Sequence, residues 1–186
     1  MEIQKSERTG DAPCYEAMQR PTLTDGVITL RAPRAGDIDR ITAAAQDPVT
    51  QHWALALPSP YLREHAVQFI EHSAAEFAGG AGYSFVAADG EDRVIAAMRV
   101  GVDGEIGYWV APDARGQGVA TRAVTLLRDW AHDALGLQRM VMQIHPDNAV
   151  SCRVAEKVGF VDSGERRIPS KGIDPDPHAI YVWSAV

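Results

Sequence analysis

The pattern of apolar and polar side chains divides the first third of the chain into short elements. Residues 27–31 alternate in polarity and are rich in β-branched side chains, which predicts a strand. Asp37 is a typical N-cap and predicts a helix over 37–46, and apolar residues at helical spacing predict a second helix over 61–78. Asp47-Pro48 closes the first helix. Residues 52–60 hold Trp53 and two prolines, so we expect a loop that either lines a binding site or packs on the domain's own core.

Three alternating segments come next and are separated by Asp-Gly turns, which predicts an antiparallel meander with strands at 83–88, 94–102 and 105–110. The remaining pattern predicts a long helix, a strand, a short helix and two final strands, at 118–135, 139–144, 148–158, 160–166 and 179–183. This order predicts a single α+β domain. Its mixed, mostly antiparallel central sheet should have about six or seven strands, flanked by about four helices.

Composition and charge exclude several classes of protein but do not indicate a reaction. The chain has 186 residues, 46 % of them apolar, which suits one soluble domain over 21–186 preceded by a flexible tail over 1–20. A net charge of −7 argues against phosphate-driven binding to nucleic acid. No apolar run could span a membrane, and the start of the chain has no signal-peptide pattern. With only two cysteines, Cys14 and Cys152, the sequence predicts a cytoplasmic protein without a disulfide framework.

The stretch after the third meander strand carries the clearest chemical signal. A strand ends at Val110, a loop follows, and a long helix begins near Gly118. The first turn of a helix leaves backbone N–H groups unpaired and partly positive, so an anion can bind there. Gly116 and Gly118 lack Cβ atoms and permit close approach, while Arg115 adds a cation. The sequence therefore predicts an anion site in this loop.

Two nucleotide-binding patterns fail at this loop. A Walker-type P-loop needs Gly-Lys-Ser/Thr, whereas the chain reads Gly118-Val119-Ala120. A Rossmann fingerprint needs a third small residue, but Thr121 occupies that position and a meander precedes the loop. Neither an NTP nor a dinucleotide is therefore expected.

Residues 115–120 instead resemble the Arg/Gln-x-x-Gly-x-Gly/Ala motif of the GCN5-related N-acetyltransferase (GNAT) superfamily. A second segment, from Asn148 to Gly159-Phe160, resembles the Asn-…-Gly-Phe segment of the same superfamily. Together they are most similar to the branch of ribosomal-protein N-terminal acetyltransferases. The resemblance covers roughly residues 27–183 and implies a GNAT-like acyltransferase domain with a V-shaped gap between strands 105–110 and 139–144.

The resemblance implies acetyl-coenzyme A (acetyl-CoA) as cosubstrate and no metal. The pantetheine arm would pair with backbone groups of Trp109, Val110 and Ala111, and Asn148 would hydrogen-bond it. A backbone N–H near Val110 would polarise the acetyl carbonyl. The pyrophosphate would bind the loop residues Arg115, Gly116, Gln117, Gly118, Val119 and Ala120.

Proton chemistry is where the sequence departs from the superfamily. Many members carry a Tyr general acid seven residues after the Asn, and here that position is Ala155. Ser151 shares a helix face with it and is predicted to stabilise the thiolate or to relay a proton through water; the alternative is that it only satisfies backbone groups at the helix start. Glu105 is predicted to act as a base through water, or else is a solvated strand end. Tyr108 is expected mainly as a core ring, although a role as an acid or in contact with the acceptor stays open.

The predicted activity is direct transfer of an acetyl group to a primary amine, either a protein N-terminus or a small amine. The alternative is a non-catalytic acyl-CoA-binding or sensor module. The helix pair His65 and His72 lacks a third metal ligand, and His145 is expected as a loop residue more than a site residue. Acceptor specificity should lie in residues 51–60, the next helix and residues 169–178, and a monomer and a homodimer are both open.

Overall fold

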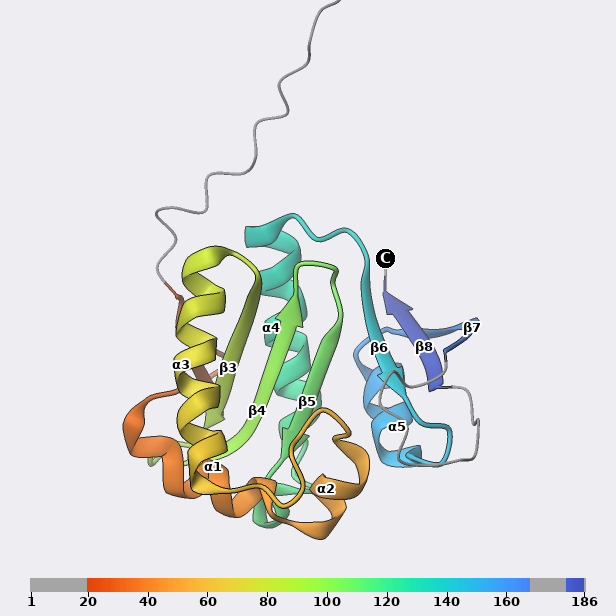
Figure 1. Cartoon of the computed structure of the whole chain (residues 1–186). Helices are drawn as coiled ribbons and strands as arrows, with labels where there is room; N and C mark the ends of the chain where they lie inside the picture. Colours follow the sequence, from red (N-terminus) through yellow and green to blue (C-terminus); the bar gives the residue numbers. More distant parts are fainter. Residues whose placement is uncertain (1–19, 168–179, 186) are drawn as a thin grey trace, which may run out of the picture.

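Two antiparallel sheets form the centre of the structure, a computed structural model that describes residues 20–167 and 180–185 (Figure 1). The first sheet has five strands in sequential order: β1 (Leu23–Thr24), β2 (Thr29–Arg31), β3 (Gly82–Ala88), β4 (Val94–Gly101) and β5 (Ile106–Val110). The second has three strands in the order β6 (Met140–Ile144), β8 (Ile180–Ala185) and β7 (Val161–Arg167).

Five α-helices surround the two sheets in the described part of the chain. They are α1 (Ile38–Ala45), α2 (Pro48–Trp53), α3 (Arg63–Gly79), α4 (Val119–Leu135) and α5 (Ala149–Lys157), with short 3-10 turns at Ala35–Asp37 and Pro112–Ala114. In Figure 1, α1 and α3 lie in front of this sheet and α4 lies behind it. α5 follows β6 and lies beside the smaller sheet.

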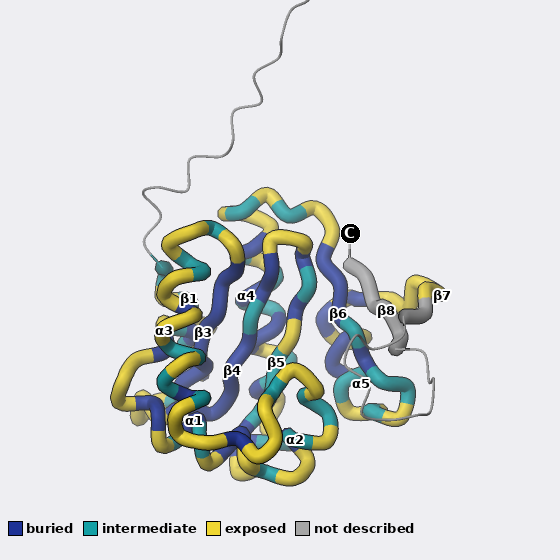
Figure 2. The backbone as a smooth tube through the Cα atoms, in the orientation of Figure 1, coloured by how far each residue is buried: buried dark blue, intermediate teal, exposed yellow. Residues whose placement is uncertain are grey.

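The core consists of two apolar clusters, one on each face of the larger sheet. Behind it, Phe85 and Leu127 are fully buried, and Trp130 of α4 meets the ring of Phe85 edge-on at 5.3 Å. In front, Ile41 and Tyr61 pack with residues of the central strands. Every residue of β3 is buried, which Figure 2 shows as a continuous dark band. β3 and β4 are therefore the buried centre of the larger sheet, and β5 is one of its two edge strands.

The α+β class and the β3–β4–β5 meander confirm the sequence prediction, but α2 does not. Pro48–Trp53 is a helix, where we expected Asp47-Pro48 only to close α1 and a loop to follow. The carboxylate of Asp47 accepts a hydrogen bond from Thr50 N–H at 2.9 Å, and Pro48 occupies the first helical turn. The same dipeptide that stops one helix therefore starts another, because proline is favoured at the first position of a helix.

The predicted tail (1–20, all but its last residue) and the loop 169–178 fall outside the described residues. Within the described ranges, no helix is long and apolar enough to cross a membrane. Those same ranges contain no group of three or more His, Cys, Asp or Glu side chains that could hold a metal ion.

Candidate functional site

The outer edge of β5 is open over most of its length. β5 and β6 run parallel but share a single bridge, between Glu105 and Val141, and belong to different sheets. Figure 1 shows them diverging beyond that point. Ala111 N–H donates to Ile95 on β4, so by strand alternation the backbone groups of Tyr108 and Val110 point away from β4, toward β6. A free strand edge in the middle of a protein is suited to an extended, amide-containing ligand.

Of the three backbone positions expected to face a ligand, Val110 is the one on the open side. Ala111 is fully buried and bonded to β4, and Trp109 pairs with Ala97 and packs into the front cluster. The carbonyl of Val110 accepts a hydrogen bond from the Arg115 side chain at 3.2 Å. The N–H of Val110 has no such partner within the described residues, so it remains available to a carbonyl oxygen.

The loop between β5 and α4 presents a row of unpaired donors. From 116 to 120, no backbone N–H finds an acceptor in the described part of the chain, and Arg122 N–H closes the first turn of α4 on Gly118. Gly116 and Gly118 have φ of +75° and +76°, a left-handed conformation that favours glycine. A Cβ on either residue would meet nothing within 4 Å, so the space beside the loop is open. Backbone conformation, more than close approach, is what requires glycine here.

The guanidinium of Arg115 turns away from this row of donors. It bonds Asp47 at 2.5 Å and the hydroxyl of Thr50 at 2.9 Å, both from the start of α2. Burial alone would raise the pKa of Asp47, but the hydrogen bonds from Arg115 and Thr50 outweigh it and lower that pKa. The side chain of Gln117 also folds back, onto the carbonyl of Asp113 at 2.9 Å. In this structure the loop therefore offers an anion its backbone, while Arg115 fastens the loop to α2.

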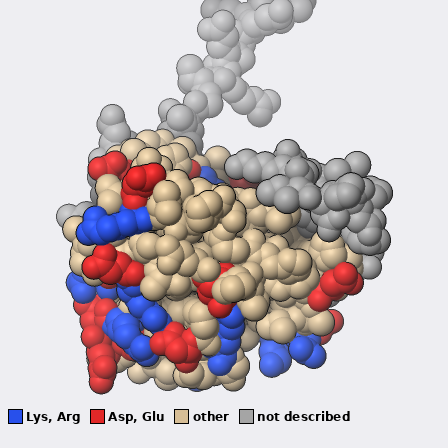
Figure 3. All heavy atoms as spheres, turned by 60° about the horizontal axis from the view of Figure 1, so that its bottom comes forward, with Lys and Arg blue, Asp and Glu red and all other residues tan. Residues whose placement is uncertain are grey.

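Other charges on this side of the molecule are paired as well. Figure 3 shows acidic and basic side chains lying beside one another, with a largely uncharged area in the middle. Asp113 binds Arg40 at 2.5 Å and Arg93 at 2.8 Å, and Arg122 binds Asp25 at 2.6 Å. Asp113 of the loop is thus bound from α1 and from the β3–β4 turn, and the first turn of α4 is bound to the β1–β2 turn.

Ser151, at the start of α5, is held by two neighbours. The Oδ1 of Asn148 accepts a hydrogen bond from Ser151 N–H at 3.1 Å, so Asn148 caps α5 as predicted. Tyr108 of β5 donates its phenolic hydrogen to Ser151 Oγ, also at 3.1 Å. This bond joins the larger sheet to the helix that follows β6. Burial raises the pKa of the Tyr108 phenol, although the bond to Ser151 acts in the opposite direction.

Glu105 lies where β5 and β6 meet. Its Oε2 accepts a hydrogen bond from the Gln143 side chain at 2.6 Å, and no described residue bonds its Oε1. Strand alternation puts Glu105 on the front face with Trp109, and Tyr108 on the back face with the cluster under α4. Three residues of extended chain separate Glu105 from Tyr108, about 10 Å. Glu105 and Ser151 therefore flank the open edge from opposite faces.

Comparisons with known proteins agree on the family. The model of the acetyltransferase (GNAT) domain matches residues 28–161. The chain belongs to the GNAT acetyltransferase family. YdaF of Bacillus subtilis (strain 168), which carries a provisional name as a ribosomal N-acetyltransferase, is 36 % identical over 63 residues. That match spans 34 % of each chain, about a third of YdaF's length.

Two solved structures share the fold at low identity. A ribosomal L7/L12 α-N-protein acetyltransferase, RimL, in complex with coenzyme A has a TM-score of 0.78 and 15 % identity, covering 89 % of this chain and 98 % of its own. The microcin C7 self-immunity acetyltransferase MccE, in complex with acetyl-CoA and AMP, has a TM-score of 0.75 and 18 % identity. That match covers 87 % of this chain and 93 % of MccE. Identities this low establish the fold and leave the acceptor open.

Two small residues on α5 bear on how a GNAT domain with this sequence could work. Ala155, at the position where many members carry Tyr, is fully buried in the back cluster and accepts Phe160 N–H at its carbonyl at 2.9 Å. Cys152 is half-buried, and burial, with a smaller contribution from Glu156, raises its thiol pKa. A thiol of this kind is a weak nucleophile at neutral pH.

An aromatic contact that the sequence did not predict spans the front of the open edge. Trp53 at the end of α2 lies 5.6 Å from the ring of His145, just after β6, and 4.3 Å from His52, measured between ring centroids. His145 Nδ1 accepts a hydrogen bond from Asp147 N–H at 3.1 Å, which leaves Nε2 to carry the proton of the neutral ring. Helix α2 thus forms a wall beside the site. In the sequence, only Trp53 and the two prolines of residues 52–60 indicated that this segment could line a binding site.

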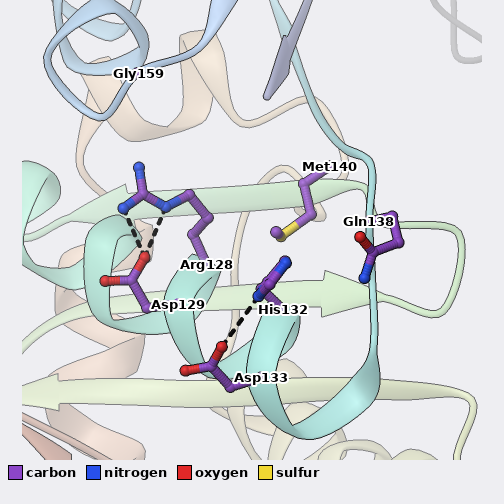
Figure 4. Close-up of a pocket in the computed structure, with 7 residues that line it drawn as sticks. All are labelled: Arg128, Asp129, His132, Asp133, Gln138, Met140 and Gly159. Carbon is purple, nitrogen blue, oxygen red and sulfur yellow. Dashed lines mark hydrogen bonds and ion pairs between the residues drawn. The ribbon is translucent and has the colours of Figure 1, made fainter. Parts of the chain in front are cut away.

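A second hollow, of about 300 Å³, lies along α4 and is unrelated to this edge (Figure 4). Its lining residues are Arg128, Asp129, His132, Asp133, Gln138, Met140 and Gly159. The charged groups pair with each other, Arg128 with Asp129 at 2.6 Å and His132 with Asp133 at 3.0 Å. Arg128 and the Nδ1 of His132 therefore already have partners within the protein.

Proposed function

We propose that the chain transfers an acetyl group from acetyl-CoA directly to a primary amine. The observation that carries this proposal is that two sets of unpaired backbone groups follow each other along the chain. The first is the open edge of β5 at Tyr108 and Val110, and the second is the row of unpaired N–H groups in residues 116–120. An extended arm with amide groups, ending in a pyrophosphate, matches that sequence of donors and acceptors.

The cofactor-binding roles follow from this continuity. The pyrophosphate binds backbone N–H groups from Gly116 to Ala120 at the start of α4, with Arg115 and Gln117 supporting the loop through Asp47 and Asp113. The pantetheine arm lies along Val110, flanked by Trp109 and Ala111. The side-chain amide of Asn148, whose Oδ1 already caps α5, donates to the arm from Nδ2.

The chemistry divides between the two faces of β5. The N–H of Val110 polarises the thioester carbonyl. On the front face, Glu105 accepts the proton of the acceptor amine through water, since it lies too far along the strand for direct contact. On the back face, Ser151 donates a hydrogen bond to the departing thiolate, helped by the positive end of α5. The raised pKa of Cys152 favours direct transfer over a covalent acyl-cysteine.

For the acceptor we propose a protein N-terminus or a small amine that enters on the front face, beside α2. Trp53, His52 and His145 supply an apolar and aromatic wall there. The name of RimL, an α-N-protein acetyltransferase, supports the first class. Among small amines, a polycationic acceptor is less favoured, because the middle of the face in Figure 3 is largely uncharged.

A non-catalytic acyl-CoA sensor is the second candidate, and the buried Ala155 favours it. Without a phenol at that position, binding could persist with no proton donor for the thiolate.

Thermal melting with acetyl-CoA, followed by thiol release over a panel of amines, tests both candidates. The panel should contain peptides with free N-termini, the same peptides with blocked N-termini, and small amines. We expect a rise in melting temperature and thiol release with at least one free amine. A rise without any turnover would favour the sensor, and a rise with NAD but not with acetyl-CoA would overturn both.

A further inference from the structure

Within the described residues, one side-chain hydrogen bond joins β5 to α5, that between Tyr108 and Ser151, and it lies behind the open edge. Its partners are 43 residues apart and come from elements attached to different sheets. Ser151 Oγ is the acceptor, so the hydrogen on that oxygen is free to point elsewhere. The bond is therefore placed to control the direction in which Ser151 donates.

Ser151 needs such control because its backbone alone does not set its hydroxyl. The bond from Ser151 N–H to Asn148 fixes the main chain, whereas a serine hydroxyl rotates among staggered positions. The phenol of Tyr108 is held by a ring that packs in the back cluster beside α4 and α5. Tyr108 thus brings a rigid donor to a rotatable group.

We propose that Tyr108 is a positioning residue that acts through Ser151, orienting the serine hydroxyl toward the sulfur of bound coenzyme A. This inference rests on the proposed function, since it requires coenzyme A along β5. As the amine nitrogen bonds the carbonyl carbon and the C–S bond breaks, the electron pair stays on sulfur. Ser151 stabilises that charge by a hydrogen bond, and the proton lost from the amine reaches the thiol through water.

The environment of Tyr108 suits a donor more than an acid. Burial raises the pKa of its phenol above the usual value, so at neutral pH it keeps its proton and donates to Ser151. The site therefore holds a chain of two hydroxyls where many GNAT domains have one phenol at the position of Ala155. That alanine belongs to the same back cluster against which Tyr108 packs.

The test is the pKa of the thiol of coenzyme A bound to the protein, followed by the ultraviolet absorbance of the thiolate. This readout needs no acceptor amine. In the unaltered protein we expect the bound thiol to titrate below free coenzyme A. Tyr108→Phe and Ser151→Ala should each raise that pKa, by about one unit for the loss of one oriented hydrogen bond. The double variant should match Ser151→Ala alone, because Tyr108 acts only through the serine.

Tyr61→Phe is the control, since it removes a phenolic hydroxyl from a buried tyrosine of the front cluster, away from Ser151, and it should leave the thiol pKa unchanged. If Tyr108→Phe raises the pKa as much in the Ser151→Ala background as in the unaltered protein, its effect is independent of the serine and the inference fails. An unchanged thiol pKa in Tyr108→Phe, with coenzyme A bound, would also overturn it while leaving the proposed function intact. Absence of any coenzyme A binding would overturn both.

Discussion

At the scale of single residues, Ala155 explains why the missing phenol cannot simply be restored. Its side chain is fully buried in the cluster that holds Phe160 and Leu127. A tyrosine there would have to displace packed neighbours, and protein interiors are close-packed. The departure from the GNAT pattern at this position is thus part of the core packing, and the mechanism that we propose gives the role of the hydroxyl to Ser151, positioned by Tyr108.

Ala155→Tyr should therefore lower the free energy of unfolding by about 1–3 kcal/mol or more, the usual result of overpacking a core. Urea denaturation measures it. Val150→Tyr, at a position of α5 that is 66 % exposed, is the matched control and should change stability by less than about 0.5 kcal/mol. Equal stability of Ala155→Tyr and the unaltered protein would mean that the cluster has room for a phenol, contrary to its packing.

At the scale of elements, the local sequence pattern predicted most of the helices and strands. It failed where the same residues can either end one helix or begin the next. Alternation and Asp-Gly turns located β3, β4 and β5, since each signal is contained in a few neighbouring residues. Asp47-Pro48 ends one helix and caps the next, so α2 was missed. Contacts between residues far apart in the sequence could not be predicted, because a local pattern carries no information about them. Nothing in the sequence says that Arg115 bonds Asp47, 68 residues away, or that Tyr108 bonds Ser151.

The bond from Arg115 to Asp47 makes α2 depend on the loop that precedes α4. Arg115→Ala should remove two hydrogen bonds to α2 and leave the partly buried Asp47 without its cation, at a cost of about 1–3 kcal/mol. Amide exchange in residues 48–57 should become faster, and coenzyme A binding weaker. Arg122→Ala, which breaks the pair with Asp25 instead, should leave exchange in α2 unchanged. Exchange in α2 that is equally slow in both variants would refute the tether.

At the scale of the whole molecule, the described carboxylates with shifted pKa values all shift in one direction. The pKa values of Asp47, Glu76, Asp89, Asp92 and Asp113 lie below the ordinary range, each with an arginine partner among the causes. Folding therefore favours the charged forms of these groups. Stability they contribute is present above their unfolded pKa values and is lost as the pH falls through the folded ones.

Asp25 allows this dependence to be isolated. Burial alone would raise its pKa, but the N–H groups of Ile28 and Val27, together with Arg122, lower it to about 2. Asp25→Asn keeps an oxygen for the two N–H groups and removes the charge, so the variant should be less stable than the unaltered protein at pH 7. Between pH 4 and about 2 the unaltered protein loses this contribution as Asp25 binds a proton, and the variant has none to lose. The urea midpoints of the two proteins should therefore converge as the pH approaches 2. A constant difference down to that pH would mean that the charge of Asp25 contributes nothing, and that the turn between β1 and β2 is held by its amide geometry alone.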